Sequence, residues 1–211
     1  IKQTLTSHPE SVSARINSLQ WAIWTALGSV ILVGFSEQSA HAQSTVKAAQ
    51  LTATRIVADP TASGQQQATV LKTGNGTVQV NIQTPSSAGV SRNTFSQFDV
   101  GSNGVVINNS RTATQSETGG AVQANPWLAK GSAQVILNEV NSRDPSQLHG
   151  TVEVAGQRAE VIIANPAGIQ VNGGTFLNAS RVTLTTGTPL FNDKGIKGYN
   201  VTQGLISIDG K

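Results

Sequence analysis

Short apolar pairs separated by turn residues dominate the carboxyl-terminal half of the sequence. In residues 161–187 these pairs are Val161/Ile163, Ile169/Val171 and Val182/Leu184. Each pair skips one residue, which is the period of a half-buried β-strand and not that of a helix. Asn-Pro-Ala-Gly at 165–168 and Asn-Gly-Gly at 172–174 separate the pairs, and these residue types favour tight turns. The pattern predicts short strands joined by corners, with the chain turning repeatedly in one direction.

The spacing of the pairs predicts a solenoid. Val161/Ile163 and Val182/Leu184 are 21 residues apart, and Ile206/Ile208 follow 24 residues later, after a polar insertion at 192–200. A second series repeats every 17 residues and consists of Val135/Leu137, Val152/Val154 and Ile169/Val171. A repeat near twenty residues that carries several short strands is typical of a parallel β-helix. We therefore expect an all-β fold in which these pairs face inward and stack. A β-sandwich is the alternative that the pattern leaves open.

The composition agrees with a long, turn-rich β structure. Only 12% of the residues are charged and 4% are aromatic, which argues against a helical bundle. The net charge is +3, but the basic residues are scattered singly, whereas nucleic-acid-binding proteins gather them on one face. We expect no nucleic-acid partner. The chain has no cysteine, so its stability must come from burial and backbone hydrogen bonds without disulfides.

The amino-terminal segment predicts export. Residues 21–35 are apolar and uncharged, but they fall short of the roughly twenty residues that a membrane-spanning helix needs. Basic residues precede this run, and Ala40 and Ala42 follow it in the small-x-small form of a signal-peptidase site. We predict a signal peptide at residues 1–42 and a mature domain at 43–211. A retained membrane anchor or an amphipathic helix is the alternative. We also expect the natural protein to extend beyond both ends of this sequence.

The start of the predicted domain has the pattern of a cap. Residues 70–82 contain two apolar strand patterns around Gly74-Asn75-Gly76, which predicts a hairpin. The exposed end of a solenoid would recruit other strands, so it needs a cover. We expect this hairpin to be an amino-terminal β cap. Phe95 and Phe98 are expected to plug the end of the core, and residues 105–107 form the next buried strand.

No catalytic or metal-binding set is visible in the sequence. His149 is the single histidine of residues 43–211, and a lone histidine beside a loop is more often solvated than catalytic. Glu153 and Glu160 could face one another across a corner, but we expect them to be exposed and solvated. There is no Asp-x-Asp pair and no calcium-binding glycine repeat. A polysaccharide lyase would need acidic and basic residues that converge on one strand face, and the sequence shows no such set. We expect no enzyme activity, metal or small-molecule cofactor.

Four segments together carry a family resemblance. They are SRNTFSQF at 91–98, NPWL at 125–128, VILNEV at 135–140 and NPAGI at 165–169. In this order they resemble the amino-terminal secretion domain of two-partner secretion exoproteins, the family of filamentous haemagglutinins and contact-dependent growth-inhibition proteins. The family's two boxes are NPNL and NPNGI, so Trp127 and Ala167 stand where asparagine is usual. The resemblance covers residues 46–208.

The resemblance implies a right-handed parallel β-helix with an amino-terminal cap and hairpins outside the helix. It also implies export by the Sec machinery and then passage through an Omp85-type outer-membrane transporter, whose periplasmic POTRA domains recognise the domain. The exoprotein would be secreted or held at the surface of a Gram-negative bacterium. The expected secretion and partner-binding residues are Asn125, Pro126, Trp127, Leu128, Asn165, Pro166, Ala167, Gly168 and Ile169.

Two alternatives stand beside this assignment. The box asparagines can be explained as corner residues alone. If they also serve secretion, we expect a β-branched replacement of Asn125 or Asn165 to strain the corner and impair export. An adhesin module that binds host glycan or protein directly would need an exposed aromatic platform, for which Trp127 and Tyr199 are the candidates.

In the secretion model, folding outside the cell favours export. Each closed coil buries about four aliphatic side chains, on the order of 6 to 10 kcal/mol before conformational entropy is subtracted.

Overall fold

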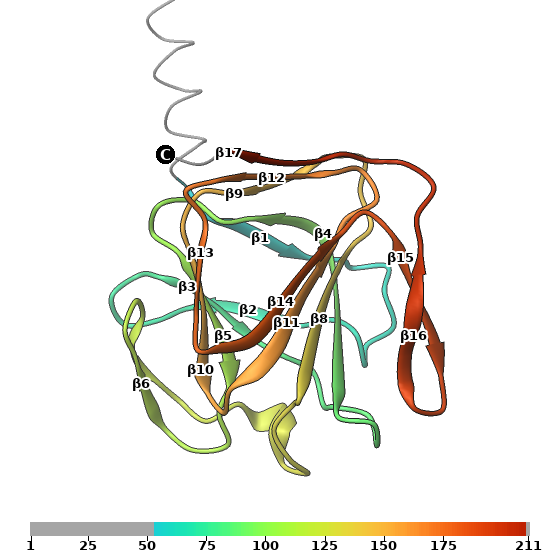
Figure 1. The fold of residues 1–211 in the computed structure, drawn as a ribbon. Coiled ribbons are helices and arrows are strands. Elements are labelled where there is room, and N and C mark those ends of the chain that lie inside the picture. Colours follow the sequence, from blue (N-terminus) through green and yellow to red (C-terminus); the bar gives the residue numbers. More distant parts are fainter. Residues whose placement is uncertain (1–52, 210–211) are drawn as a thin grey trace, which may run out of the picture. The chain divides into compact units, whose positions relative to one another are not determined.

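The chain of residues 53–209 winds as a three-sided coil of β-strands in the computed structural model (Figure 1). The predicted signal peptide and its Ala40-x-Ala42 site lie outside the described residues. Three sheets form the sides. In spatial order, sheet A consists of β1 (Arg55–Ala58), β4 (Val90–Asp99), β8 (Val135–Val140), β11 (Ala159–Ala164) and β14 (Ala179–Thr185). Sheet B consists of β13 (Thr175–Leu177), β10 (Thr151–Gly156), β5 (Val105–Asn109), β3 (Val78–Asn81) and β2 (Thr69–Lys72). Sheet C consists of β17 (Ile206–Asp209), β12 (Ile169–Asn172) and β9 (Ser146–Leu148).

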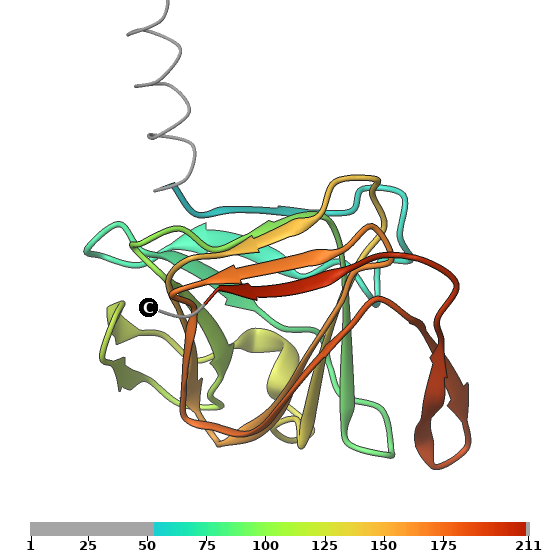
Figure 2. The ribbon, with the colours of Figure 1, turned by 45° about the horizontal axis from the view of Figure 1, so that its top comes forward.

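Each full coil visits the sheets in the order A, C, B. The chain runs through β8, β9 and β10 in one coil and through β11, β12 and β13 in the next, and equivalent strands pair in parallel. Figure 2 shows the strands of sheet C lying one above another. The predicted all-β parallel β-helix is confirmed, and the β-sandwich alternative is wrong. None of the helical structure in residues 53–209 is long and apolar enough to cross a membrane.

Antiparallel strands close one end of the coil. β2 pairs with β3 at the edge of sheet B, and β1 pairs with β4 at the edge of sheet A. The predicted cap hairpin is therefore confirmed. Beneath β1, the fully buried rings of Phe95 and Phe98 meet edge to face with centroids 5.2 Å apart, a favourable aromatic geometry. They fill the core at the capped end, as the sequence predicts.

Two hairpins lie outside the coil. β6 (Thr114–Ser116) pairs with β7 (Gly120–Val122), and β15 (Thr188–Asn192) pairs with β16 (Gly195–Asn200), both antiparallel. The second hairpin includes the polar insertion noted at 192–200. A single 3₁₀ turn, η1 (Pro126–Leu128), connects β7 to β8.

The 17-residue series does not stack, contrary to expectation. Val135, Val152 and Ile169 belong to β8, β10 and β12, which lie on three different sheets. A step of 17 residues therefore leads to a strand of a different sheet, and not to the equivalent strand of the next coil. The 21-residue step is confirmed, because Val161 pairs directly with Val182. Ile206 is placed differently from the prediction, since it stacks on Ile169 in sheet C and not on the β14 pair.

One strand faces the opposite way to that expected. In β8 it is Ile136 that belongs to the central core, whereas Leu137 joins a separate cluster on the outer face of sheet A, although both are fully buried. The run Val-Ile-Leu is apolar on both faces, so its sequence has no alternation to reveal which face points inward. The pairs Val152/Val154, Val161/Ile163 and Ile169/Val171 do face the core as predicted.

Candidate functional site: two asparagine corners and an adjoining groove

Asn125 ties three segments together at the corner before β8. Its side chain is 3% exposed. The Nδ2 group donates to the carbonyl oxygens of Ile82 and Asn108 at 2.9 and 3.0 Å, and Oδ1 accepts from the Trp127 N–H at 3.0 Å. The backbone is extended, with φ −77° and ψ 115°, as expected for a residue before proline. This extended conformation suits β-branched residues, so the expected strain from such a replacement is wrong. The cost would come from the lost hydrogen bonds.

The 3₁₀ turn after Asn125 directs one side chain of the first box into the core and another to the surface. Leu128 is fully buried in the central core, and Trp127 is 43% exposed. The indole Nε1 donates to Thr69 Oγ1 in the cap at 3.1 Å, and Thr84 Oγ1 donates to the Trp127 carbonyl at 2.7 Å. The NPWL box therefore holds the cap hairpin against the first coil.

Asn165 repeats this arrangement between β11 and β12. The side chain is fully buried. Its Nδ2 donates to the Asp144 carbonyl and to Ser146 Oγ, both at 3.0 Å, and its Oδ1 accepts from the Ala167 N–H at 2.9 Å. In both boxes, Oδ1 caps the amide two residues ahead while Nδ2 reaches a neighbouring segment.

Gly168 and Ile169 complete the second corner. Gly168 has φ +129°, and a Cβ atom there would lie 3.0 Å from the Leu205 carbonyl oxygen. A side chain would be strained in both respects. Ile169 is fully buried in the central core, while Pro166 and Ala167 are half-buried.

The two boxes do not form one surface. The first lies where the chain passes from sheet B to sheet A, and the second where it passes from sheet A to sheet C. Of the nine predicted residues, Pro126 and Trp127 alone are exposed. In the folded domain the boxes act as corners, and their asparagine side chains are inaccessible to a partner.

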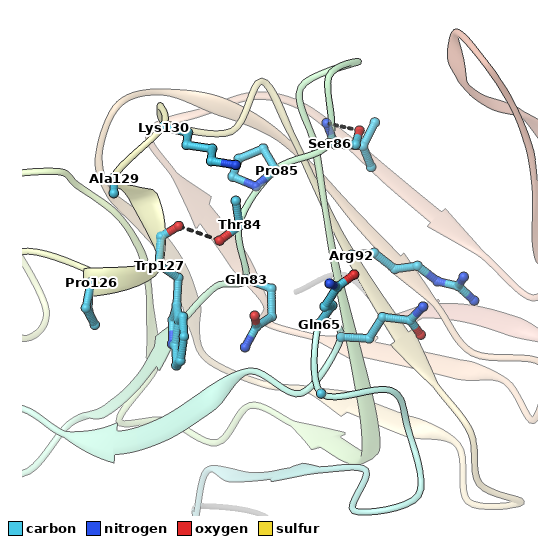
Figure 3. Close-up of a pocket in the computed structure, with 13 residues that line it drawn as sticks. Gln65, Gln83, Thr84, Pro85, Ser86, Arg92, Pro126, Trp127, Ala129 and Lys130 are labelled. Carbon is cyan, nitrogen blue, oxygen red and sulfur yellow. Dashed lines mark hydrogen bonds between the residues drawn. The ribbon is translucent and has the colours of Figure 1, made fainter.

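A groove of about 600 Å³ adjoins Trp127 (Figure 3). Its lining combines an indole, side-chain amides, a hydroxyl and a lysine, contributed by Trp127, Gln65, Gln66, Gln83, Thr84 and Lys130, among others. The Gln83 amide donates to the Gln67 carbonyl, which fixes its orientation. Sequence reasoning identified Trp127 but missed the glutamines. They are distant in sequence from the boxes, and no local pattern distinguishes them from other polar residues of the cap.

The outer face of sheet A carries two ion pairs that the sequence does not reveal. Arg92 contacts Glu139 at 2.5 Å, and Arg181 contacts Glu160 at 2.6 Å. Each pair joins strands of neighbouring coils. Acidic and basic residues thus do converge on one strand face, contrary to expectation, but each carboxylate is matched by its own guanidinium.

Glu153 is buried, and the expectation of a solvated pair with Glu160 is wrong. It is 4% exposed. Its carboxylate accepts hydrogen bonds of 2.7–2.8 Å from Ser116 Oγ, the Glu117 N–H, and the N–H and Oγ1 of Thr118. Burial alone would raise the pKa of Glu153, but these hydrogen bonds to the charged form outweigh it, and the pKa lies below its ordinary value. The carboxylate therefore anchors the β6–β7 hairpin to β10.

The remaining candidates do not assemble into a site. His149 is half-buried and not fully solvated as expected; its Nδ1 lies 3.3 Å from the Asn172 carbonyl. Tyr199 is half-buried and lines a different depression from Trp127, beside Glu160 and Arg181. The two aromatics therefore do not form a common platform.

Comparisons with known proteins place this arrangement in context. Residues 54–211 match the family model described as the TPS secretion domain. The chain is 59% identical over 156 residues to the toxin CdiA of Yersinia pestis, and 43% identical over 199 residues to the filamentous hemagglutinin of Bordetella pertussis. These alignments cover 74% and 94% of the chain but only 5% of either relative. A crystal structure of a filamentous hemagglutinin secretion domain superimposes with a TM-score of 0.66 at 47% identity, covering 73% of this chain and 49% of that one.

Proposed function

Because the chain belongs to the TPS secretion domain family, which serves secreted or cell-surface exoproteins of Gram-negative bacteria, we propose that it is recognised in the periplasm by the POTRA domains of an Omp85-type transporter. The family assigns this segment a secretion role that needs an outer-membrane transporter. Residues 1–42 would direct Sec export, and residues 43–211 would form the secretion domain of a larger adhesin or toxin.

The burial of the box residues carries this proposal. Asn125, Asn165 and Ile169 are at most 3% exposed once the coil has formed. Recognition that reads these side chains must therefore precede folding. An extended chain with few charges can add a strand to the open edge of a partner's sheet, where main-chain hydrogen bonds supply affinity and alternate side chains supply specificity. After passage, the same residues close the corners.

Folding outside the cell then favours outward movement. Both boxes help to close coils, since Leu128 and Ile169 enter the central core directly beside their asparagine corners. A closed coil cannot thread back through a pore without unfolding. The free energy of burial, reduced by the entropy cost of ordering the chain, thus gives transport a direction without ATP.

Binding to isolated POTRA domains tests the recognition step. We expect residues 43–211, kept unfolded in a low concentration of urea, to bind with a Kd in the micromolar range, about −8 kcal/mol. The refolded domain is the matched control, and it should bind at least tenfold more weakly because its boxes are buried. Calorimetry and crosslinking provide the readouts. No binding by either form would count heavily against POTRA recognition.

The names of the relatives do not extend this function to catalysis. Some are called tRNA nucleases, such as CdiA-2 of Burkholderia pseudomallei, but the chain aligns with only 5% of that protein. The part matched here is described as a secretion domain, which is a transport and not a catalytic role.

Direct binding of host glycan is a second candidate, favoured by the groove beside Trp127. An exposed indole flanked by amides and a hydroxyl can stack on a sugar ring and bond its hydroxyls. If the groove serves this purpose, a glycan array with the folded chain will give signals that Trp127→Ala reduces at least tenfold. Leu190→Ala, which removes an equally exposed apolar side chain elsewhere, serves as the control. An array without signals would exclude this candidate for the glycans tested.

A further inference from the structure

We propose that the β15–β16 hairpin is a clasp that locks the fourth coil of the β-helix to the first. The hairpin leaves the chain between β14 and β17, the two strands of the fourth coil, and lies outside the coil in both views (Figures 1 and 2). It packs back over the outer face of sheet A.

The surface beneath the hairpin is built from three coils. The outward-facing residues Val90, Leu137, Ile162 and Ala164 form one apolar cluster and are 0–8% exposed. They come from β4, β8 and β11, in the first, second and third coils. Ile196 and Tyr199 of β16 pack against this cluster. An outward face of a sheet is ordinarily solvated, so the hairpin supplies the cover that makes these apolar side chains stabilising.

The hairpin also touches the first coil directly. The Phe191 ring centroid lies 4.8 Å from Cζ of Arg92, whose guanidinium is already fixed by Glu139 of the second coil. This distance is within the range of a cation–π contact. At the hairpin tip, a Cβ atom added to Gly195 would lie 3.4 Å from Val90 Cγ2. Arg92 and Phe191 are 99 residues apart in sequence.

These contacts change how the ends of the solenoid can unfold. In an ordinary solenoid each repeat touches only its neighbours, so the ends can fray one coil at a time. The clasp belongs to the fourth coil and contacts residues of the first, second and third coils, so it links the first coil directly to the fourth. Its docking surface exists only after β4, β8 and β11 have stacked, so closure follows the stacking of these three strands. Once the clasp is closed, neither the first nor the fourth coil can open without also breaking the contacts of the hairpin. Its consequence for export, which rests on the proposed function, is that the closed domain cannot slip back coil by coil.

Hydrogen exchange on the purified 211-residue chain tests the clasp without any transporter, so its outcome is separate from that of the POTRA proposal. We expect the double variant Ile196→Ser/Tyr199→Ser to accelerate amide exchange at least tenfold in β4 and β8, far from the substitutions in sequence. Leu190→Ser is the matched control, because Leu190 lies in β15, is 47% exposed and is outside the cluster. It should change exchange in β4 by less than twofold.

A milder variant keeps the test decisive if the double variant does not fold. Phe191→Ser removes the ring over Arg92 and leaves the cluster intact, and we expect exchange in β4 to rise about threefold, as the loss of an exposed cation–π contact allows. Acceleration confined to residues 188–200 in both variants, or in Phe191→Ser alone if the double variant is unfolded, would overturn the clasp.

Discussion

Asn125→Ala and Asn165→Ala are each expected to destabilise the folded domain by about 3 kcal/mol, because each removes three buried or partly buried hydrogen bonds and leaves their partners without replacements. In a domain of this size, that loss lowers Tm by roughly 6–12 °C. Urea unfolding and thermal denaturation of the purified variants measure the effect. Asn103→Ala is the control, since Asn103 is exposed in a turn, and it should leave stability within about 0.5 kcal/mol of the parent.

The same variants separate the two roles of the boxes. If the corners support export through folding or recognition, both variants will accumulate in the periplasm, and the amount in the medium will fall while Asn103→Ala is exported normally. Normal export rates for both destabilised variants would make direct involvement of the boxes untenable. A variant whose unfolded chain binds the POTRA domains normally but which is exported poorly would assign its box to folding alone.

Glu153→Gln is expected to cost about 3 kcal/mol, because four hydrogen bonds converge on this buried carboxylate and an amide presents one NH₂ group toward the same donors. The β6–β7 hairpin should loosen first, which limited proteolysis within residues 110–125 would detect. Glu117→Gln is a matched control, since it makes the same change of charge in the same loop at an exposed position. Equal losses in the two variants would show that net charge, and not the buried hydrogen bonds, is responsible.

The pH dependence of stability follows from the same carboxylate. The pKa of Glu153 is lower in the folded state than its ordinary value of 4.5. Glu153 therefore contributes its stability fully above pH 4.5, and this contribution is lost as the pH falls through the lower, folded-state pKa. Denaturant titrations between pH 7 and pH 3 should show a steeper acid loss for the parent chain than for Glu153→Gln, which has no carboxylate to protonate.

Local patterns in the sequence were sufficient to predict the solenoid and its corners. Alternation placed Val161 and Ile163 in the core, and the glycine-rich turn after β2 predicted the cap hairpin. Alternation says which face of a strand is buried, but it does not say which sheet the strand joins. The 17-residue spacing therefore predicts a single stack, whereas its strands lie on three sheets. The Val-Ile-Leu run of β8 misled for a related reason, since both of its faces are buried.

The features that the sequence did not predict depend on contacts between distant residues. The sequence around Glu153 gives no sign of burial. In the folded structure, the β6–β7 hairpin covers its carboxylate and supplies the hydrogen-bond donors. Arg92 and Glu139 are 47 residues apart, and the groove beside Trp127 combines the cap with the first corner. The asparagines of the boxes were correctly identified as corner residues. Their contacts to Ile82 and Asp144, which tie each corner to a neighbouring segment, required the folded structure.

The position of Trp127 has a practical consequence for spectroscopy. The other two tryptophans of the chain, Trp21 and Trp24, lie in the segment predicted to be cleaved, so residues 43–211 contain a single indole. That indole donates a hydrogen bond to Thr69 of the cap and lies at the first corner. Its fluorescence emission would shift to longer wavelength as the ring becomes more hydrated. Stopped-flow fluorescence of residues 43–211 would therefore time the docking of the cap on the first coil without any introduced label.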